Sequence, residues 1–287
     1  MIPPLMHRFL LIICLLFSLL STTLEAKAYP KRKSVEFVIV VPSRNNERWV
    51  IKNLESIISQ TYPHFTVVYI NDSSTDLTGS FVDAFVSAHK LQTKFTVIHN
   101  KVRKGAMQNL YEAISKIDPG KVVIDLDGDD RLADPKVLEY LAEIYGEYSP
   151  NHPNATWVTY GSFKSDPPGY PNCSHKFPKE VCKKRSFRSH PWQSSHLKTF
   201  YAKLFQNIKE EDFKHHGDYF PMTSDLAIMF PILEQASRGH IYFVKKVLCI
   251  YNIANPIQDT KMNAQLQQHL ERVIRQKPRY PALTTLF

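Results

Sequence analysis

The chain has 287 residues, of which 43% are hydrophobic and 22% charged, so it can bury a core, and global disorder is excluded. Lys and Arg number 36 against 27 acidic residues, and the net charge of +9 suits an anionic ligand, whether nucleotide, phosphate, nucleic acid or lipid headgroup. The basic residues are scattered and are not interleaved with stacking aromatic residues, which argues against a nucleic-acid partner.

The N-terminus contains an apolar run at residues 9–20, followed by the small residues Ala26 and Ala28 around Lys27, a pattern that signal peptidases cut. A helix of this run would span only about 18 Å, less than the ~30 Å hydrocarbon core. We therefore expect residues 1–28 to be a signal peptide or a short membrane anchor, followed by a basic linker at 29–35. This predicts a protein that is exported, in the secretory pathway or membrane-anchored. The basic linker favours a cytosol-facing anchor instead, and this alternative stays open.

From residue 36, strand and helix patterns alternate. Runs rich in β-branched residues predict strands at 36–41, 65–70, 95–98 and 121–126, as in a parallel sheet buried on both faces. Helical spacing predicts helices at 50–60, 77–89, 106–117 and 135–145. This order predicts an α/β fold with a doubly wound sheet, in which the carboxyl ends of the strands meet at one rim. Polar stretches at 42–47, 71–76 and 127–130 fall at these ends.

The second half has a less regular pattern. It predicts strands at 156–162, 241–244 and 247–251, and helices at 199–208, 226–236 and 264–275. Residues 163–191 are rich in Pro, Gly, Lys and Ser and are expected to form a long loop over the rim. Within it, Cys173 and Cys182 could form a disulfide in an oxidising compartment. Cys249 lies in an apolar run and is expected to be buried.

Four carboxylates follow one another closely where the predicted strand 121–126 ends: Asp125, Asp127, Asp129 and Asp130. Clustered like charges repel, so a cation is expected to compensate them. A divalent metal ion shared with a diphosphate suits these oxygen ligands. A calcium-binding EF-hand loop is excluded, because Asp130 stands where that loop needs Gly. An acidic turn that caps the next helix would explain Asp130 but not the whole set.

Three ordered segments resemble the signatures of family 2 glycosyltransferases with a GT-A fold: residues 39–45 (IVVPSRN), 69–76 (YINDSSTD) and 127–132 (DGDDRL). The resemblance implies a Rossmann-like, mostly parallel sheet with a nucleotide-sugar-binding half at 36–135. An α-rich acceptor-binding half of the same domain would follow at 136–287. It further implies a UDP- or GDP-type sugar donor, Mn²⁺ or Mg²⁺ as cofactor, and inverting transfer to a hydroxyl of a glycan, lipid or protein.

The same resemblance implies roles for individual residues. Pro42 and Arg44 would shape the nucleotide pocket, and Asp72 would accept a hydrogen bond from the base. Asp127 would lie near the ribose and the metal, and Asp129 would bind the metal that bridges the diphosphate. The nucleotide base stays open, because residue 71 is Asn where the family often has Asp.

Residues 100–109 (NKVRKGAMQN) resemble the family's glycine-containing segment. Gly105 permits a close approach of the backbone, and either Lys104 or Arg103 could reach a phosphate. A solvated basic turn is an equal alternative for each cation.

Residues 192–200 and 221–227 look like segments of one bacterial branch of the family, in which an Asp at the start of a helix is the expected catalytic base. Asp225 fits this position, although an Asp there could instead be a helix N-cap. Trp192 and His196 are candidates for acceptor or sugar contacts, although a lone His is more often structural.

Two other functions stay open. A sugar-phosphate nucleotidyltransferase pairs a similar sheet with Mg²⁺ but usually begins with a Gly-rich phosphate loop, and residues 42–46 contain no glycine. A non-catalytic nucleotide-sugar-binding protein would lack the base, and Asp225 argues against it. The absence of a Gln-x-x-Arg-Trp sequence argues against a processive polysaccharide synthase.

Overall fold

The computed structural model describes residues 34–257 and 259–287. The apolar run expected to be a signal peptide or an anchor lies outside the described residues, as does most of the basic linker. Within the described part of the chain, no helix is long and apolar enough to cross a membrane. The localisation predicted from the leader is therefore corrected: the described residues provide no support for a membrane anchor.

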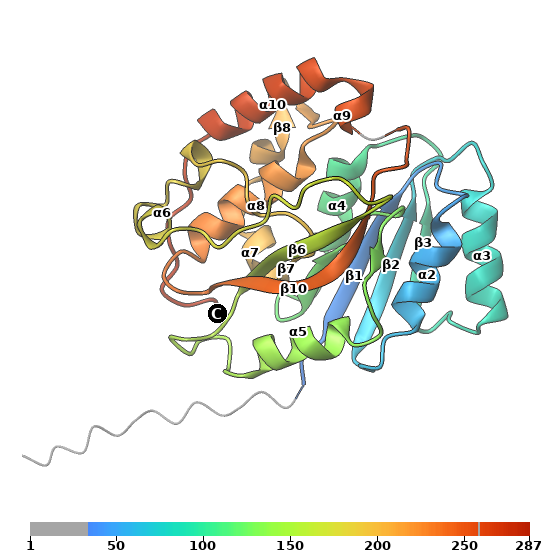
Figure 1. The fold of residues 1–287 in the computed structure, drawn as a ribbon, viewed down its shortest axis with the longest axis horizontal. Helices are drawn as coiled ribbons and strands as arrows, with labels where there is room; N and C mark the ends of the chain where they lie inside the picture. The colour runs from blue at the N-terminus through green and yellow to red at the C-terminus, as the bar shows by residue number, and fades with distance from the viewer. Residues whose placement is uncertain (1–33, 258) are drawn as a thin grey trace, which may run out of the picture. The chain divides into compact units, whose positions relative to one another are not determined.

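The centre of the fold is an eight-stranded sheet with the order β3-β2-β1-β4-β7-β6-β10-β5 (Figure 1). Its parallel half contains β1 (Phe37–Ser43), β2 (Phe65–Asn71), β3 (Phe95–His99) and β4 (Val122–Asp125). All residues of β1 and β4 are buried, as their continuous apolar runs predict for strands covered on both faces.

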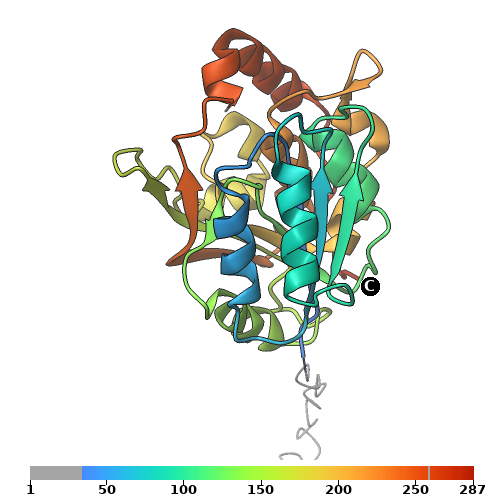
Figure 2. The same ribbon diagram turned by 90° about the vertical axis from the view of Figure 1, so that its right-hand side faces the viewer.

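Helices α2 (Val50–Ile58) and α3 (Thr78–Ala88) lie side by side over one face of this half (Figure 2). The winding direction reverses between β1 and β4, so the right-handed crossover through α4 (Ala106–Ile114) lies on the opposite face. This reversal makes the carboxyl ends of β1 and β4 the topological switch point, where folds of this kind bind ligands.

The other half of the sheet is mixed. β7 (Lys198–Tyr201) runs antiparallel to β4 and to β6 (Val158–Asp166). β10 (Ile241–Asn252) runs parallel to β6, and β5 (Arg131–Leu132) pairs with β10 at the edge. The helices outside the parallel half include α5 (Val137–Gly146), α7 (Ala202–Gln206), α8 (Ser224–Gln235), α9 (Asp259–Met262) and α10 (Ala264–Gln276). A small hairpin joins β8 (Lys214–His215) to β9 (Asp218–Tyr219). The mostly parallel sheet and α-rich C-terminal region confirm the predicted fold class.

Several predictions for the second half are wrong in detail. The helix predicted at 199–208 begins at Ala202, because the preceding residues pair with β4 and β6 as β7. The strands predicted at 241–244 and 247–251 form one strand, β10, with register shifts around Val247. In the predicted loop 163–191, β6 continues to Asp166, and a short helix α6 (Lys179–Lys184) and a 3-10 turn (Phe187–Ser189) follow. Cys173 and Cys182 are free, so the possible disulfide is not formed.

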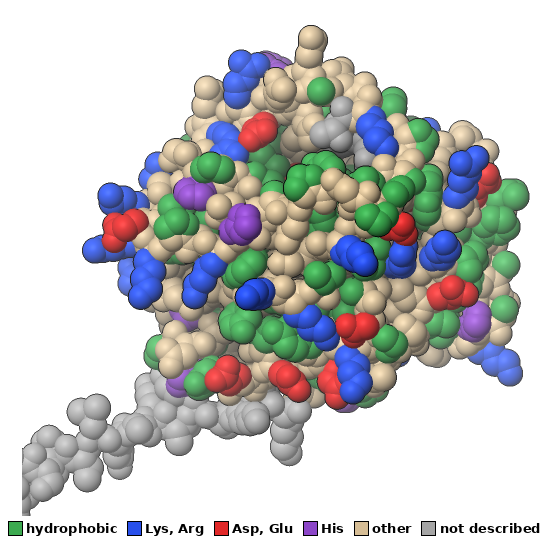
Figure 3. All heavy atoms as spheres, viewed as in Figure 1, with side chains coloured by type: hydrophobic (Ala, Val, Ile, Leu, Met, Phe, Trp, Pro, Cys, Tyr) green, Lys and Arg blue, Asp and Glu red, His purple; other side chains and the backbone are tan. Residues whose placement is uncertain are grey.

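Lys and Arg side chains lie on both sides of the face in Figure 3, with Asp and Glu among them. On this face the positive charge is not gathered into one stripe, in agreement with the scattered basic residues of the sequence.

Candidate active site

The acidic loop after β4 is fixed against the end of β1. The backbone N–H of Gly128 donates to the carbonyl of Pro42 at 3.1 Å. A Cβ atom at Gly128 would lie 2.4 Å from Ser43 Oγ, closer than real Cβ atoms come to such a neighbour. Ser43 Oγ accepts hydrogen bonds from Tyr69 at 2.7 Å and from Asn46 at 3.0 Å. Only glycine therefore allows the loop to approach β1 this closely.

The four carboxylates of the acidic loop differ in exposure. Asp125 and Asp130 are buried, whereas Asp127 and Asp129 are partly exposed at the rim. Burial raises the pKa of Asp127 to about 7 against the opposing charge of Lys198, and the neighbouring Asp125 and Asp129 add to the rise. Burial also raises the pKa of Asp129. These crowded oxygen donors fit a hard divalent cation such as Mn²⁺ or Mg²⁺, whose charge would relieve the repulsion.

Two amide side chains that the sequence analysis did not single out contact Asp129. Nδ2 of Asn255 donates to Asp129 Oδ2 at 2.7 Å, and Nδ2 of Asn252 lies 3.4 Å from the same oxygen. Asn255 also donates to Asn46 Oδ1 at 3.2 Å. Both residues lie where β10 ends, and β10 shares the direction of β1. The rule that found the other rim segments, polar residues after the carboxyl end of a strand, would also have found these two.

Asp72 ties the end of β2 to the turn before α4. Its Oδ1 accepts hydrogen bonds from Lys104 N at 2.9 Å and Asn100 Nδ2 at 2.8 Å, and its Oδ2 accepts from Gly105 N at 2.8 Å. Burial opposes ionisation, but these hydrogen bonds outweigh it and lower the pKa of Asp72. Gly105 has a φ of +86°, a conformation that favours glycine. The ammonium group of Lys104 pairs with Glu112 at 2.7 Å.

The other candidates for the nucleotide pocket lie beside Asp72. Pro42 is buried in β1, and Arg44 is partly exposed after it, with Nη1 3.5 Å from the carbonyl oxygen of Asp72. Asp76 accepts hydrogen bonds from the backbone N–H groups of Thr78 and Glu47, as in a turn that caps a helix.

Asp225 lies in the first turn of α8, and Thr223 occupies the N-cap position. Oδ1 of Asp225 accepts a hydrogen bond from Leu226 N at 2.9 Å, so Asp225 satisfies a backbone amide at the helix end without being the N-cap. Burial raises the pKa of Asp225, and the charge of Lys198 opposes the rise. Asp125 acts electrostatically on the same carboxyl group. Electrostatic interactions thus link the start of α8 to charged residues of β4 and β7.

The two candidates for acceptor contacts have aromatic neighbours. Trp192 packs edge-on against Phe230, with ring centroids 5.4 Å apart. His196 stacks on Tyr251, with centroids 4.7 Å apart, and burial lowers its pKa well below the usual value, so the ring is neutral.

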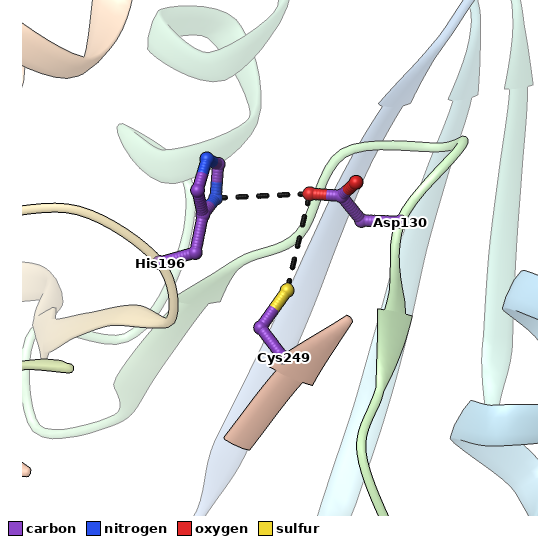
Figure 4. Close-up of side chains that lie close together, drawn as sticks. All are labelled: Asp130, His196 and Cys249. Atoms are coloured by element: carbon purple, nitrogen blue, oxygen red, sulfur yellow. Dashed lines mark hydrogen bonds and ion pairs between the residues drawn. The ribbon is translucent and has the colours of Figure 1, made fainter. Parts of the chain in front are cut away.

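His196 also belongs to a cluster with Asp130 and Cys249 (Figure 4). Nδ1 of His196 lies 3.7 Å from Asp130 Oδ2, and Sγ of Cys249 lies 3.9 Å from it. The three side chains could hold a metal ion, and their thiol and imidazole groups suit a softer ion than Mn²⁺ or Mg²⁺. However, burial raises the pKa of Cys249 well above its usual value, and Asp130 already accepts from Asn252 N at 2.8 Å. The arrangement fits a hydrogen-bond network that orients Asp130 better than it fits the ion of a diphosphate.

The doubly wound sheet, an acidic loop at its switch point and an α-rich region beyond define the GT-A architecture. The model of glycosyl transferase family 2 matches residues 38–209, more than half of the chain, and the chain belongs to this family. Membership of a glycosyltransferase family argues against the nucleotidyltransferase alternative.

Similar proteins agree with this assignment. An uncharacterized glycosyltransferase of Haemophilus influenzae is 33% identical over 101 residues, covering 35% of this chain and 30% of that protein. Glycosyltransferase GlyG of Streptococcus pneumoniae is 30% identical over 92 residues, covering 32% of this chain and 29% of that protein. The matches thus span about a third of each relative's length.

Two solved structures share the fold. S. aureus TarS 1-349 in complex with UDP-GlcNAc is similar with a TM-score of 0.55 and 20% identity, covering 76% of this chain and 58% of that one. The mannosyltransferase PcManGT from Pyrobaculum calidifontis, in complex with GDP-Man and Mn²⁺, also has a TM-score of 0.55. It is 18% identical, and the match covers 88% of this chain and 68% of that one.

Proposed function

We propose that this glycosyltransferase moves a sugar from a nucleoside-diphosphate sugar to an acceptor hydroxyl, with Mn²⁺ or Mg²⁺ held by Asp127 and Asp129. The observation that carries the proposal is the pair of partly exposed carboxylates on a loop fixed at the switch point between β1 and β4. When bound, the ion would neutralise charge that develops on the leaving diphosphate. Asn255 and Asn252 orient Asp129 toward this role.

The nucleotide would lie beside Pro42, Arg44 and the turn that Asp72 organises around Lys104 and Gly105. A carboxylate offers about four lone pairs, and three protein donors already use Asp72. One acceptor position is thus left for an N–H group of a nucleotide base. The complexes of TarS with UDP-GlcNAc and of PcManGT with GDP-Man and Mn²⁺ support a UDP- or GDP-type donor and a divalent ion.

Asp225 is the proposed base that accepts the proton of the attacking hydroxyl. It comes from α8, in the half of the domain at 136–287 that we assign to a glycan, lipid or protein acceptor. The donor would occupy the half at 36–135, and a base on the far side of the anomeric carbon from the diphosphate gives inversion. Trp192 and His196 are the proposed acceptor or sugar contacts, and their aromatic rings suit the apolar faces of sugars.

Isothermal titration calorimetry with UDP and GDP, each with and without MnCl₂, tests the donor site. We expect Mn²⁺-dependent binding to the parent protein and at least about tenfold weaker binding to Asp129→Asn, because one charged metal ligand is lost. Asp134→Asn is the matched control: its carboxylate follows the same loop but pairs with Lys246 at 3.2 Å. Unchanged affinity of Asp129→Asn with Mn²⁺ present would contradict the metal site. A parent protein that binds neither nucleotide would contradict the donor site.

A further inference from the structure

Four aromatic side chains form a cluster in the second half of the sheet. Phe163 lies on β6 and Tyr251 on β10, whereas Tyr170 follows β6 and His196 precedes β7. The ring centroid of Tyr251 lies 4.7 Å from that of His196, 5.3 Å from that of Phe163 and 5.9 Å from that of Tyr170. The rings of Phe163 and Tyr170 are 6.3 Å apart. These are the separations of interacting aromatic rings, and we call the four residues the aromatic cluster.

The aromatic cluster lies at the same rim of the sheet as the acidic loop. β6 and β10 run in the direction of β1 and β4, because β7 is antiparallel to both β4 and β6. Tyr251 is followed by Asn252, whose backbone N–H donates to Asp130 Oδ1 at 2.8 Å and whose Nδ2 lies 3.4 Å from Asp129 Oδ2. His196 points toward Asp130 (Figure 4), with Nδ1 3.7 Å from Oδ2. The cluster therefore begins beside the proposed metal ligand Asp129, and all its members come from the half of the domain assigned to the acceptor.

Exposure to solvent increases across the aromatic cluster. Phe163 is 4% exposed, Tyr251 and His196 are partly exposed, and Tyr170 is 50% exposed. Single exposed apolar residues are common on protein surfaces, so the exposure of Tyr170 does not by itself indicate a site. Here, however, the exposed ring continues a row of aromatic side chains that leads from Asp129 to the surface. A ligand at the acidic loop that extends toward solvent would therefore pass over these rings.

Polar contacts hold the loop that carries Tyr170 in place. The backbone N–H of Tyr170 donates to Oγ of the buried Ser165 at 3.1 Å, and the same hydroxyl group lies 3.5 Å from the carbonyl oxygen of Tyr170. Asp166 pairs with Arg131 at 2.8 Å, and its carbonyl accepts a hydrogen bond from Ile253 N at 2.9 Å. The fold thus places the backbone of Tyr170 before any ligand binds, which lowers the cost of ordering this ring in a complex.

We propose that the aromatic cluster is a platform for a saccharide, with Tyr170 as its outermost contact, so that the acceptor of this enzyme is a glycan. This inference rests on the proposed function and narrows its acceptor to one class. A pyranose ring has an apolar face of C–H groups and an edge of hydroxyl groups. A half-exposed Tyr ring offers an apolar face and a polar hydroxyl group to match them. Ser165, Asp166 and Arg131 beside this loop are polar, and covering them with a lipid chain would be costly.

Saturation-transfer NMR tests the platform in the absence of nucleotide. The probes are the methyl glycosides of glucose, galactose, mannose and N-acetylglucosamine, together with octyl glucoside. The parent protein is compared with Tyr170→Ala, with Tyr170→Phe and with the matched control Tyr242→Ala. Tyr242 is 42% exposed and lies on the same strand as Tyr251, but near the start of β10, at the opposite rim. Thermal melting checks that each variant is folded, and calorimetry with UDP or GDP and MnCl₂ tests the donor site of the parent separately.

We expect saturation transfer from the parent to the ring C–H protons of at least one methyl glycoside. Tyr170→Ala should bind that glycoside roughly two- to tenfold more weakly, the loss typical of one aromatic contact. Tyr170→Phe should keep most of the affinity because it keeps the ring, and Tyr242→Ala should bind like the parent.

Three outcomes would overturn the inference. The parent could bind none of the methyl glycosides, or Tyr170→Ala and Tyr242→Ala could bind them equally well. Saturation transfer only to the alkyl protons of octyl glucoside would make a lipid the occupant instead. If the parent binds neither UDP nor GDP with MnCl₂, the proposed donor site fails, and the saccharide measurements still decide whether the aromatic cluster is a platform.

Discussion

Gly128→Ala tests whether the acidic loop must lie against the end of β1. The new Cβ would lie 2.4 Å from Oγ and 2.5 Å from Cβ of Ser43, and 2.9 Å from Nδ2 of Asn46. Ser43 and Asn46 are buried, and Ser43 Oγ cannot rotate away without losing the hydrogen bonds from Tyr69 and Asn46. Overpacking of this kind costs about 1–3 kcal/mol. For a domain of this size that lowers the Tm by roughly 2–12 °C.

Because the loop carries Asp127 and Asp129, Gly128→Ala should also weaken Mn²⁺-dependent binding of UDP or GDP. Thermal melting and calorimetry measure the two effects. Ser43→Gly should restore the Tm of Gly128→Ala in part, whereas Ser43→Ala should not, because the Cβ at 2.5 Å remains. Gly146→Ala is the control, since its nearest neighbour, Val35 Cγ2, lies at an ordinary 3.6 Å. A Gly128→Ala protein that melts within a degree of the parent and binds nucleotide equally well would refute the close approach.

Three further outcomes follow from the site. Asp72→Ala should weaken Mn²⁺-dependent binding of UDP or GDP by about 1–3 kcal/mol, because three hydrogen-bond donors lose their acceptor; a large fall in Tm with normal affinity would mean that Asp72 only forms the turn. Asp225→Asn should bind donor and metal like the parent, since Asn can still accept from Leu226 N, but turn over roughly 10²–10⁴-fold more slowly. Near-parental donor hydrolysis by Asp225→Asn would place the base elsewhere. The folded state raises the pKa of Asp127 from 3.8 to about 7, so it binds this proton more tightly than the unfolded state. The metal-free protein should therefore lose stability as pH rises through this range, and Mn²⁺ should raise the Tm more at pH 8 than at pH 5. If the Tm of the metal-free protein did not change with pH, the predicted loss of stability toward higher pH would be wrong.

The parallel half of the fold could be predicted from the sequence because its signals are local. The strands β1 and β4 are covered on both faces, so each appears as a continuous apolar run. Parallel strands put their carboxyl ends at one rim, so the positions of Asp72, Asp127 and Asp129 follow from where the runs stop. Gly128 stood out in the sequence only as part of a motif, and its close approach to Ser43 explains why glycine is needed there.

The partners across the site were decided by tertiary structure. Asn255 contacts Asp129 across 126 residues of sequence, and Lys198 pairs with Asp125 only because β7 lies between β4 and β6. The apolar pattern around Phe200 fits a helix as well as a strand, and the pairing with β4 and β6 decides for the strand. Local sequence patterns predict which residues are buried, but they do not predict which buried residues contact one another. The charge balance of Asp225 depends on that second kind of information, because electrostatic interactions follow distance in space rather than separation along the chain.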